Sequence, residues 1–164
     1  MRKLLASLFL IITLGMAQGA NAGPKEDAFA ANNRGDFATA LSLLRPLATQ
    51  GDAWAQTSLG FMYHNGQGVP RDDKEAIRWY RLAAAQGYAL AQYNLGVMFN
   101  NGQGVPQDDK EAVRWYRLAA AQGNAEAQYN LRLRYEQEQA VLQDNGRAHM
   151  WYSFNANDKS QKTD

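Results

Sequence analysis

The sequence predicts an all-α protein built from stacked helical hairpins. Residues 51–86 and 87–122 are identical at 27 of 36 positions without a gap. The same turn and helix-capping signals recur in both copies, and no segment alternates between apolar and polar residues as a half-buried strand would. A tandem repeat of this length is typical of a solenoid, in which each unit buries its apolar face against the next.

Residues 23–50 predict a truncated unit at the start of the array. Moved forward by 36 residues, this segment and the glycine that follows it match the next unit at six positions: Asp36, Ala40, Arg45, Ala48, Gln50 and Gly51. We expect a helix over residues 25–33, followed by a short turn and a second helix over residues 37–49. Pro46 should bend the second helix, because proline has no N–H to donate to the carbonyl four residues earlier.

Each full unit predicts two helices joined by a turn. In the first copy the helices cover residues 53–64 and 74–85. The segment 65–70 contains two glycines that tolerate positive φ and ends in Val-Pro, which stops a helix. Asp72, with Glu75 three residues later, is typical of a capping box that begins the second helix. The glycine pair could suggest a phosphate loop, but no strand precedes it and no Walker lysine follows, so it predicts a turn.

The third copy, residues 123–158, is degenerate. It keeps the segment AQYNL and a Trp-Tyr pair but loses the glycine-rich centre, as terminal repeats often do. The Trp-Tyr pairs of the three copies are in step: Trp79-Tyr80, Trp115-Tyr116 and Trp151-Tyr152. Because the pairs are identical and stand beside alanines that permit close helix packing, they predict a role in the core. The polar residues 159–164 predict a disordered tail.

The first 22 residues predict a secretory signal peptide. Arg2 and Lys3 precede an apolar run over residues 4–16, and the sequence Ala-Asn-Ala that ends at Ala22 fits a signal-peptidase site. The apolar run is shorter than the roughly 20 residues that a membrane-spanning helix needs. We therefore expect cleavage after Ala22, export to the periplasm or the medium, and a mature chain without a stable membrane anchor. An uncleaved anchor is the alternative.

The composition limits the classes of partner. The chain is 46% hydrophobic and 20% charged, with a mean hydropathy of −0.52, which is the profile of a globular protein. Removing Arg2 and Lys3 from the 17 basic residues leaves 15 against 16 acidic residues, so the mature chain is near neutral and disfavours nucleic acid as a ligand. The chain has no cysteine, which excludes a cysteine nucleophile, a thiolate metal site and a lipid-modified N-terminal cysteine.

The repeat pattern AxAQxxLGxMYxxGxGVPxDxxxAxxWYRLAAxxG resembles the Sel-one-like repeat, a relative of the tetratricopeptide repeat. The match covers residues 25–158. The resemblance implies a right-handed superhelix of about three and a half repeats, whose usual role is to bind other proteins or peptides, but it does not identify the partner. It also leaves an enzymatic alternative, because some exported relatives with cysteine-rich repeats are described as penicillin-binding proteins or weak β-lactamases. This chain departs from them in having no cysteine.

The nine differences between the two full copies indicate where a ligand would bind. Seven of them fall on the first helix of the unit or its cap. At about 100° per residue, positions 54, 57, 58, 61 and 64 share a face about 120° wide, whereas the identical positions occupy the other side. This variable face combines apolar side chains with amides and hydroxyls, as a peptide-binding groove does. In tetratricopeptide-like solenoids the first helix lines the concave surface, so the resemblance places the groove there.

The candidate binding residues are those of the variable face in the three copies: Trp54, Thr57, Ser58, Phe61, His64, Leu90, Tyr93, Asn94, Val97, Asn100, Tyr129, Asn130 and Leu133. The apolar side chains would act as anchors, and the polar ones would satisfy the backbone of an extended ligand. The alternative for any one of them is packing against the helices of the next unit.

No pattern in the chain indicates catalysis. The two histidines, His64 and His149, occupy different repeat positions, and no metal-binding or nucleophile motif accompanies them. Several arginines predict solvated faces and ion pairs between repeats: Arg78, Arg81, Arg114, Arg117, Arg132 and Arg134. An anionic ligand site is the alternative for these arginines. We therefore predict a non-enzymatic adaptor for a protein or peptide, without metal or cofactor. A structural or glycan-associated component of the cell envelope is a further alternative.

Overall fold

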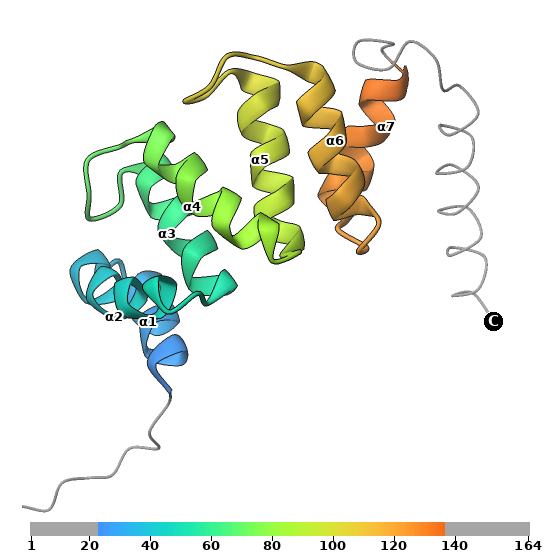
Figure 1. Ribbon diagram of the computed structural model, residues 1–164. Coiled ribbons are helices and arrows are strands. Elements are labelled where there is room, and N and C mark those ends of the chain that lie inside the picture. Colours follow the sequence, from blue (N-terminus) through green and yellow to red (C-terminus); the bar gives the residue numbers. More distant parts are fainter. Residues whose placement is uncertain (1–22, 137–164) are drawn as a thin grey trace, which may run out of the picture.

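The computed structural model describes residues 23–136, which form seven helices (Figure 1). The helices are α1 (Pro24–Asn33), α2 (Phe37–Thr49), α3 (Ala53–Asn65), α4 (Asp73–Ala85), α5 (Ala89–Asn101), α6 (Asp109–Ala120) and α7 (Ala125–Glu136). No strand occurs within residues 23–136, and each predicted helix is found within one residue of its expected bounds. The all-α prediction is therefore confirmed.

Several sequence predictions concern segments beyond the described residues. These are the signal peptide over residues 1–22, His149, the pair Trp151-Tyr152 and the tail 159–164. Among the helices that the structure does describe, none has the length and apolar character needed to cross a membrane.

The helices follow one another along a curved path, with α1 and α2 at one end and α7 at the other (Figure 1). Each helix contacts its neighbours in the sequence, and α5 also meets α7. The helices pair as α1–α2, α3–α4 and α5–α6, and α7 is the first helix of a further unit. This nearest-neighbour packing is the architecture of a helical-hairpin solenoid of about three and a half repeats.

The second helices begin at aspartate caps. The Asp72 carboxylate accepts hydrogen bonds from the backbone N–H groups of Lys74 and Glu75, at 3.0 Å each, and the arrangement recurs 36 residues later. The reciprocal half of the predicted capping box is not formed. Glu75 binds Arg78 at 2.7 Å, while the Asp72 N–H donates to a carbonyl of α3. The aspartate alone therefore acts as the cap.

Glycines let the two helices of each full hairpin approach closely. A Cβ atom on Gly60 would lie 2.6 Å from the Tyr80 ring, and one on Gly96 would lie 2.5 Å from the Tyr116 ring. Both tyrosines are buried, so no side chain larger than hydrogen fits beneath either ring. Tyr80, Tyr116 and Trp79 are core residues, as predicted. In α7 the position of these two glycines is taken by Arg132, whose side chain leaves no room for a tyrosine ring packed in the same way.

Buried glutamines join successive repeats. The Gln56 side chain donates to the carbonyl of Ala48 at the end of α2 (3.1 Å) and accepts from Gln86 at the end of α4 (2.8 Å). Gln92 repeats both bonds one unit later, and Gln128 repeats the first of them. Each of these side chains thus ties a first helix to the second helix of the preceding unit.

The arginines only partly follow the prediction. Arg78 and Arg114 pair with a glutamate three residues earlier in the same helix, and each guanidinium lies over the ring of the next residue, a tryptophan. The expectation of ion pairs between repeats is wrong for these two, because the glutamate of their own helix turn is nearer. Arg134 does reach another helix, since its Nη1 lies 3.6 Å from Oδ1 of Asp109 in α6.

Candidate functional site

The first helices carry the exposed apolar residues of the predicted face. Phe61 on α3, Leu90 on α5 and Tyr129 on α7 are 48%, 46% and 54% exposed. Counted from the glycine that begins each repeat, they occupy positions 11, 4 and 7. At 100° per residue these positions lie within about 60° of one another around the helix. The structure therefore leaves one large apolar side chain open to solvent on the variable face of each of these three helices.

Other predicted residues are less open. Thr57 is only 3% exposed, and its hydroxyl donates to the carbonyl of Ala53 (2.8 Å). Its assignment to the groove is wrong, because this edge of the face turns into the core and the hydroxyl is satisfied by its own helix. Ser58 and Trp54 are half-buried. The Ser58 hydroxyl donates to the Trp54 carbonyl (2.9 Å), and the indole packs against the core of the first units.

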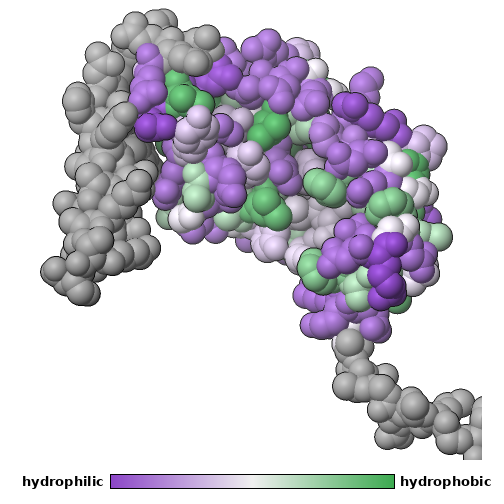
Figure 2. Space-filling model, turned by 180° about the vertical axis from the view of Figure 1, so that it is seen from behind, coloured by the Kyte–Doolittle hydropathy of each residue, from purple (hydrophilic) through white to green (hydrophobic). Residues whose placement is uncertain are grey.

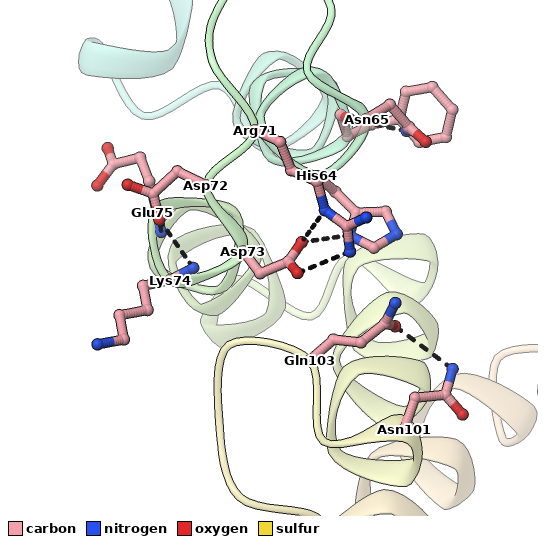
Figure 3. A network of polar contacts seen from close by, with 10 residues as sticks. His64, Asn65, Arg71, Asp72, Asp73, Lys74, Glu75, Asn101 and Gln103 are labelled. Carbon is pink, nitrogen blue, oxygen red and sulfur yellow. Dashed lines mark hydrogen bonds and ion pairs between the residues drawn. The ribbon is translucent and has the colours of Figure 1, made fainter.

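His64 belongs to a polar cluster at the end of α3 (Figure 3). Its Nδ1 lies 2.7 Å from Oδ1 of Asp73, and the Arg71 guanidinium binds the same carboxylate at 2.8 Å. Partial burial would raise the pKa of Asp73, but the hydrogen bonds and charges of Arg71 and His64 outweigh it and hold that pKa below its ordinary value. In the next repeat Asn100 replaces His64 and Gln107 replaces Arg71. The cluster is therefore specific to the first full unit.

A pocket of about 340 Å³ opens between α5 and α7, with α6 behind it. Its lining residues are Tyr93, Val97, Asn100, Asn101, Tyr116, Asn130, Leu133 and Arg134. Five of these were predicted from the variable face: Tyr93, Val97, Asn100, Asn130 and Leu133. Of the remaining candidates, Asn94 is half-buried on α5 and does not line the pocket. The fold thus brings residues from two repeats into one concave site.

Amides dominate the polar side of this pocket. The Asn100 amide nitrogen donates to Asn101 Oδ1 (2.8 Å), and the Asn101 amide nitrogen donates in turn to Gln103 (3.3 Å; Figure 3). Asn100 Oδ1 is buried and has no hydrogen-bond partner among the described residues. Among the described residues, Arg134 is the only charged one that lines this pocket, and Asp109 offsets its charge. The pocket therefore presents a vacant acceptor in nearly neutral surroundings.

The tyrosines complete the pocket on its inner side. The rings of Tyr93 and Tyr116 are 6.0 Å apart and tilted by 36°, a common geometry for packed aromatic pairs. Burial raises the pKa of Tyr116 well above that of an exposed tyrosine, and the neighbouring Tyr93 contributes. Its hydroxyl therefore stays protonated at neutral pH and remains a hydrogen-bond donor.

Comparison with known proteins places this architecture in a family. The model of the Sel1 repeat matches residues 55–88, 89–124 and 125–154, which together make up more than half of the chain. The chain belongs to the Sel1 repeat family. Sel1 repeats generally mediate protein–protein interactions, and Sel1 repeat proteins are generally non-catalytic scaffolds.

Solved structures of other Sel1 repeat proteins share the fold. A Sel1 repeat protein from Oxalobacter formigenes is 31% identical, with a TM-score of 0.72, and the match covers 77% of this chain and 52% of that one. The protein c5321, a protective antigen of uropathogenic Escherichia coli with an SLR fold, is 30% identical, with a TM-score of 0.73 over 82% of this chain and 30% of its own. The chain thus spans only part of either relative.

A more distant likeness shows the fold alone. The cysteine-rich protein B (hcpB) of Helicobacter pylori is 19% identical, with a TM-score of 0.52 over 66% of this chain and 97% of its own. No curated protein sequence matches the chain.

Three pocket residues of this Sel1 repeat protein were missed by the sequence analysis. Asn101 and Tyr116 escaped because the same residues stand at these positions in the preceding repeat, so they are not among the differences. Arg134 had a visible signal: it follows Met62 and Met98 at the same repeat position, where both methionines are buried. An arginine in a core position should have marked α7 as a site where the repeat packing changes.

The serine, threonine and histidine side chains of α3 are engaged within the chain. No group of three or more potential metal ligands occurs within residues 23–136. The hydroxyls of Ser58 and Thr57 donate to backbone carbonyls, and His64 is paired with Asp73. What these Sel1 repeats offer on their first helices is a row of apolar side chains next to a pocket lined with amides.

Proposed function

We propose that the chain is an exported, non-catalytic module that binds a protein or peptide along the first helices of its repeats. The observation that carries this proposal is the row formed by Phe61, Leu90 and Tyr129, one exposed apolar side chain on each of α3, α5 and α7. A helix face that only meets water is normally polar, whereas exposed aromatic and aliphatic anchors are typical of interfaces. We call this row the anchor row.

The spacing of the anchor row favours an elongated ligand. The three side chains lie on successive repeats, so a partner must span several helices to meet them all. Figure 2 shows one face of the molecule, on which hydrophobic side chains form separate patches with hydrophilic ones between them. The anchor row, with one exposed apolar side chain on each of α3, α5 and α7, suits a partner that makes separate apolar contacts and hydrogen-bonds between them.

Export is part of the proposal and rests on the sequence alone. The basic start, the short apolar run and the small residues before Gly23 are what a signal peptidase recognises. The partner would then be a protein of the periplasm or the extracellular space. The enzymatic alternative has no specific support, because the likeness to the cysteine-rich protein is one of fold.

Site-specific photo-cross-linking tests the proposed surface. A photoreactive phenylalanine analogue would replace Leu90 or Tyr129 in the anchor row, and Leu82 or Leu118 as controls. The controls are also apolar and 43% and 42% exposed, but they lie on the second helices α4 and α6. We expect a discrete protein adduct in the native envelope from the anchor-row positions only. Equal adducts from both sets would contradict the assignment of the surface, as would adducts from the controls alone.

A further inference from the structure

We propose that the pocket between α5 and α7 binds one uncharged peptide unit of an extended partner segment, with a main-chain N–H of that segment donating to Asn100 Oδ1. This inference rests on the proposed function and assigns a chemistry to one part of the surface. The pocket volume of about 340 Å³ lies at the lower end of the range for pockets that hold small ligands, which suits one or two residues.

Asn100 holds a buried oxygen that has no hydrogen-bond partner among the described residues. One N–H of its amide nitrogen donates to Asn101, whereas this oxygen can only accept. A buried acceptor without a partner is unfavourable, and a ligand that donates to it removes that penalty. A backbone N–H is such a donor, whereas a carboxylate has no proton to give at neutral pH.

The charge beside the pocket is nearly balanced. Arg134 could attract an anion, but Asp109 lies 3.6 Å from its guanidinium and also accepts from Gln107 at 3.5 Å. Asp109 does not line the pocket, but its negative charge beside Arg134 offsets the positive one, so the combined field favours a neutral group. On the apolar side of the pocket, Val97 and Leu133 provide contact for an aliphatic side chain.

The repeat pattern changes at the junction of α5 and α7, where the pocket lies. At the junction of α3 and α5, one repeat earlier, the residues are Thr57, Met98 and His64. Thr57 and Met98 are buried, and His64 is paired with Asp73. At the junction of α5 and α7 the corresponding residues are Tyr93, Arg134 and Asn100, and the pocket opens. Departures from a regular pattern that create a cavity lined with satisfiable polar groups are expected at functional sites.

Three small probes test the chemistry on the purified protein. They are N-acetyl-L-leucine N-methylamide, its methyl ester analogue, which lacks the second N–H, and N-acetyl-L-leucine, which carries a carboxylate. Binding is followed through the side-chain amide signals of Asn100 and Asn130 in ¹H–¹⁵N spectra. With 13 non-hydrogen atoms, the amide probe is expected to bind with a dissociation constant on the order of 1 mM. The ester and the acid should bind at least about fivefold more weakly.

Two variants locate the effect. Asn100→Leu removes the acceptor and should abolish the preference for the amide over the ester, whereas Asn100→Asp keeps an acceptor and should retain it. Asn65→Leu is the matched control, because Asn65 is an exposed amide outside the pocket and should leave binding unchanged. Circular dichroism establishes that each variant is folded.

Three results would overturn the inference: no probe moves the two amide signals, the acid binds best, or Asn100→Leu keeps the preference. The second of these would mean an anion site at Arg134 instead. Failure here is distinguishable from failure of the proposed function, because cross-linking at Leu90 and Tyr129 does not depend on the pocket. Adducts at the anchor row without probe binding would leave the module intact and remove only the peptide-group assignment.

Discussion

Replacing Gln92 by leucine tests how the repeats are held together. The two side chains are similar in volume, so the change removes hydrogen bonds without opening a large cavity. Gln92 donates to the Ala84 carbonyl (3.3 Å) and accepts from Gln122 (2.7 Å), which links α5 to the end of α4 and the end of α6. Gln122→Leu is the partner variant, because it removes only the second of these bonds.

The expected loss of stability on Gln92→Leu depends on which hydrogen bonds the two partners of Gln92 still make. The Ala84 carbonyl still accepts from the Gly87 N–H at 3.0 Å, and the Gln122 amide still lies 3.3 Å from the Leu118 carbonyl, so neither is left without a partner. The loss is therefore that of two ordinary hydrogen bonds at about 0.5–1.5 kcal/mol each, or about 1–3 kcal/mol for Gln92→Leu. Gln122→Leu leaves the oxygen of the buried Gln92 side chain without its donor, so it should lower the free energy of unfolding by about 1–3 kcal/mol.

Urea unfolding followed by circular dichroism measures both variants and the double variant. With a urea dependence of about 2 kcal/mol per molar, a loss of about 2 kcal/mol lowers the midpoint by about 1 M. Because Gln92 and Gln122 share one hydrogen bond, the double variant should be at most about 0.5 kcal/mol less stable than Gln92→Leu. Strictly additive effects, or a change below about 0.5 kcal/mol for Gln92→Leu, would refute the role given to this glutamine.

Three further predictions concern other parts of the chain. Gly96→Ala should lower the free energy of unfolding by about 1–3 kcal/mol despite the better helix propensity of alanine, because the new Cβ would lie 2.5 Å from the Tyr116 ring; calorimetry would show a gain instead if that ring can move aside. The pKa of Asp73 is lowered in the folded state, so its ionised form contributes stability above its ordinary pKa of 3.8 that is lost as the pH falls through the folded value. Acid titration of Asp73→Asn should therefore show a smaller loss of stability than the parent below that pH, and identical curves would argue against the cluster. Mass spectrometry of the exported protein should find Gly23 as its first residue, and a chain that retains Met1 would contradict cleavage after Ala22.

Most of the helical framework could be predicted from the sequence because its signals are local. Asp72 caps the helix that follows it, and Gly66 takes the left-handed conformation that ends α3. These interactions lie within a few residues of one another, so the sequence pattern alone located the helix ends. The reciprocal contact of Glu75 was predicted wrongly, because Arg78 on the next helix turn competes for the same carboxylate.

The candidate site was predicted less completely because it depends on contacts between repeats. Comparing the two copies identified Asn100 as variable, but it could not show that Asn100 on α5 and Arg134 on α7 line the same pocket. The helical angle places Thr57 on the variable face, yet Thr57 lies at the edge of that face that packs into the core. The angle of a residue around its helix does not by itself show whether the residue is buried. Tyr116 was correctly predicted as core and also lines the pocket, so one residue serves both roles.

The most direct test of the account is capture of a partner from the native envelope by matched double variants. Phe61→Glu with Leu90→Glu places two charges in the anchor row, and Leu82→Glu with Leu118→Glu places the same charges at similarly exposed positions on the second helices. Covering a half-exposed anchor contributes about 1 kcal/mol, and burying an unpaired carboxylate costs more, so the first pair should weaken binding by at least about 30-fold. The account predicts that a discrete protein is retained by the parent and by the control pair but lost with the anchor-row pair, all three being folded. Equal retention by both pairs would contradict it.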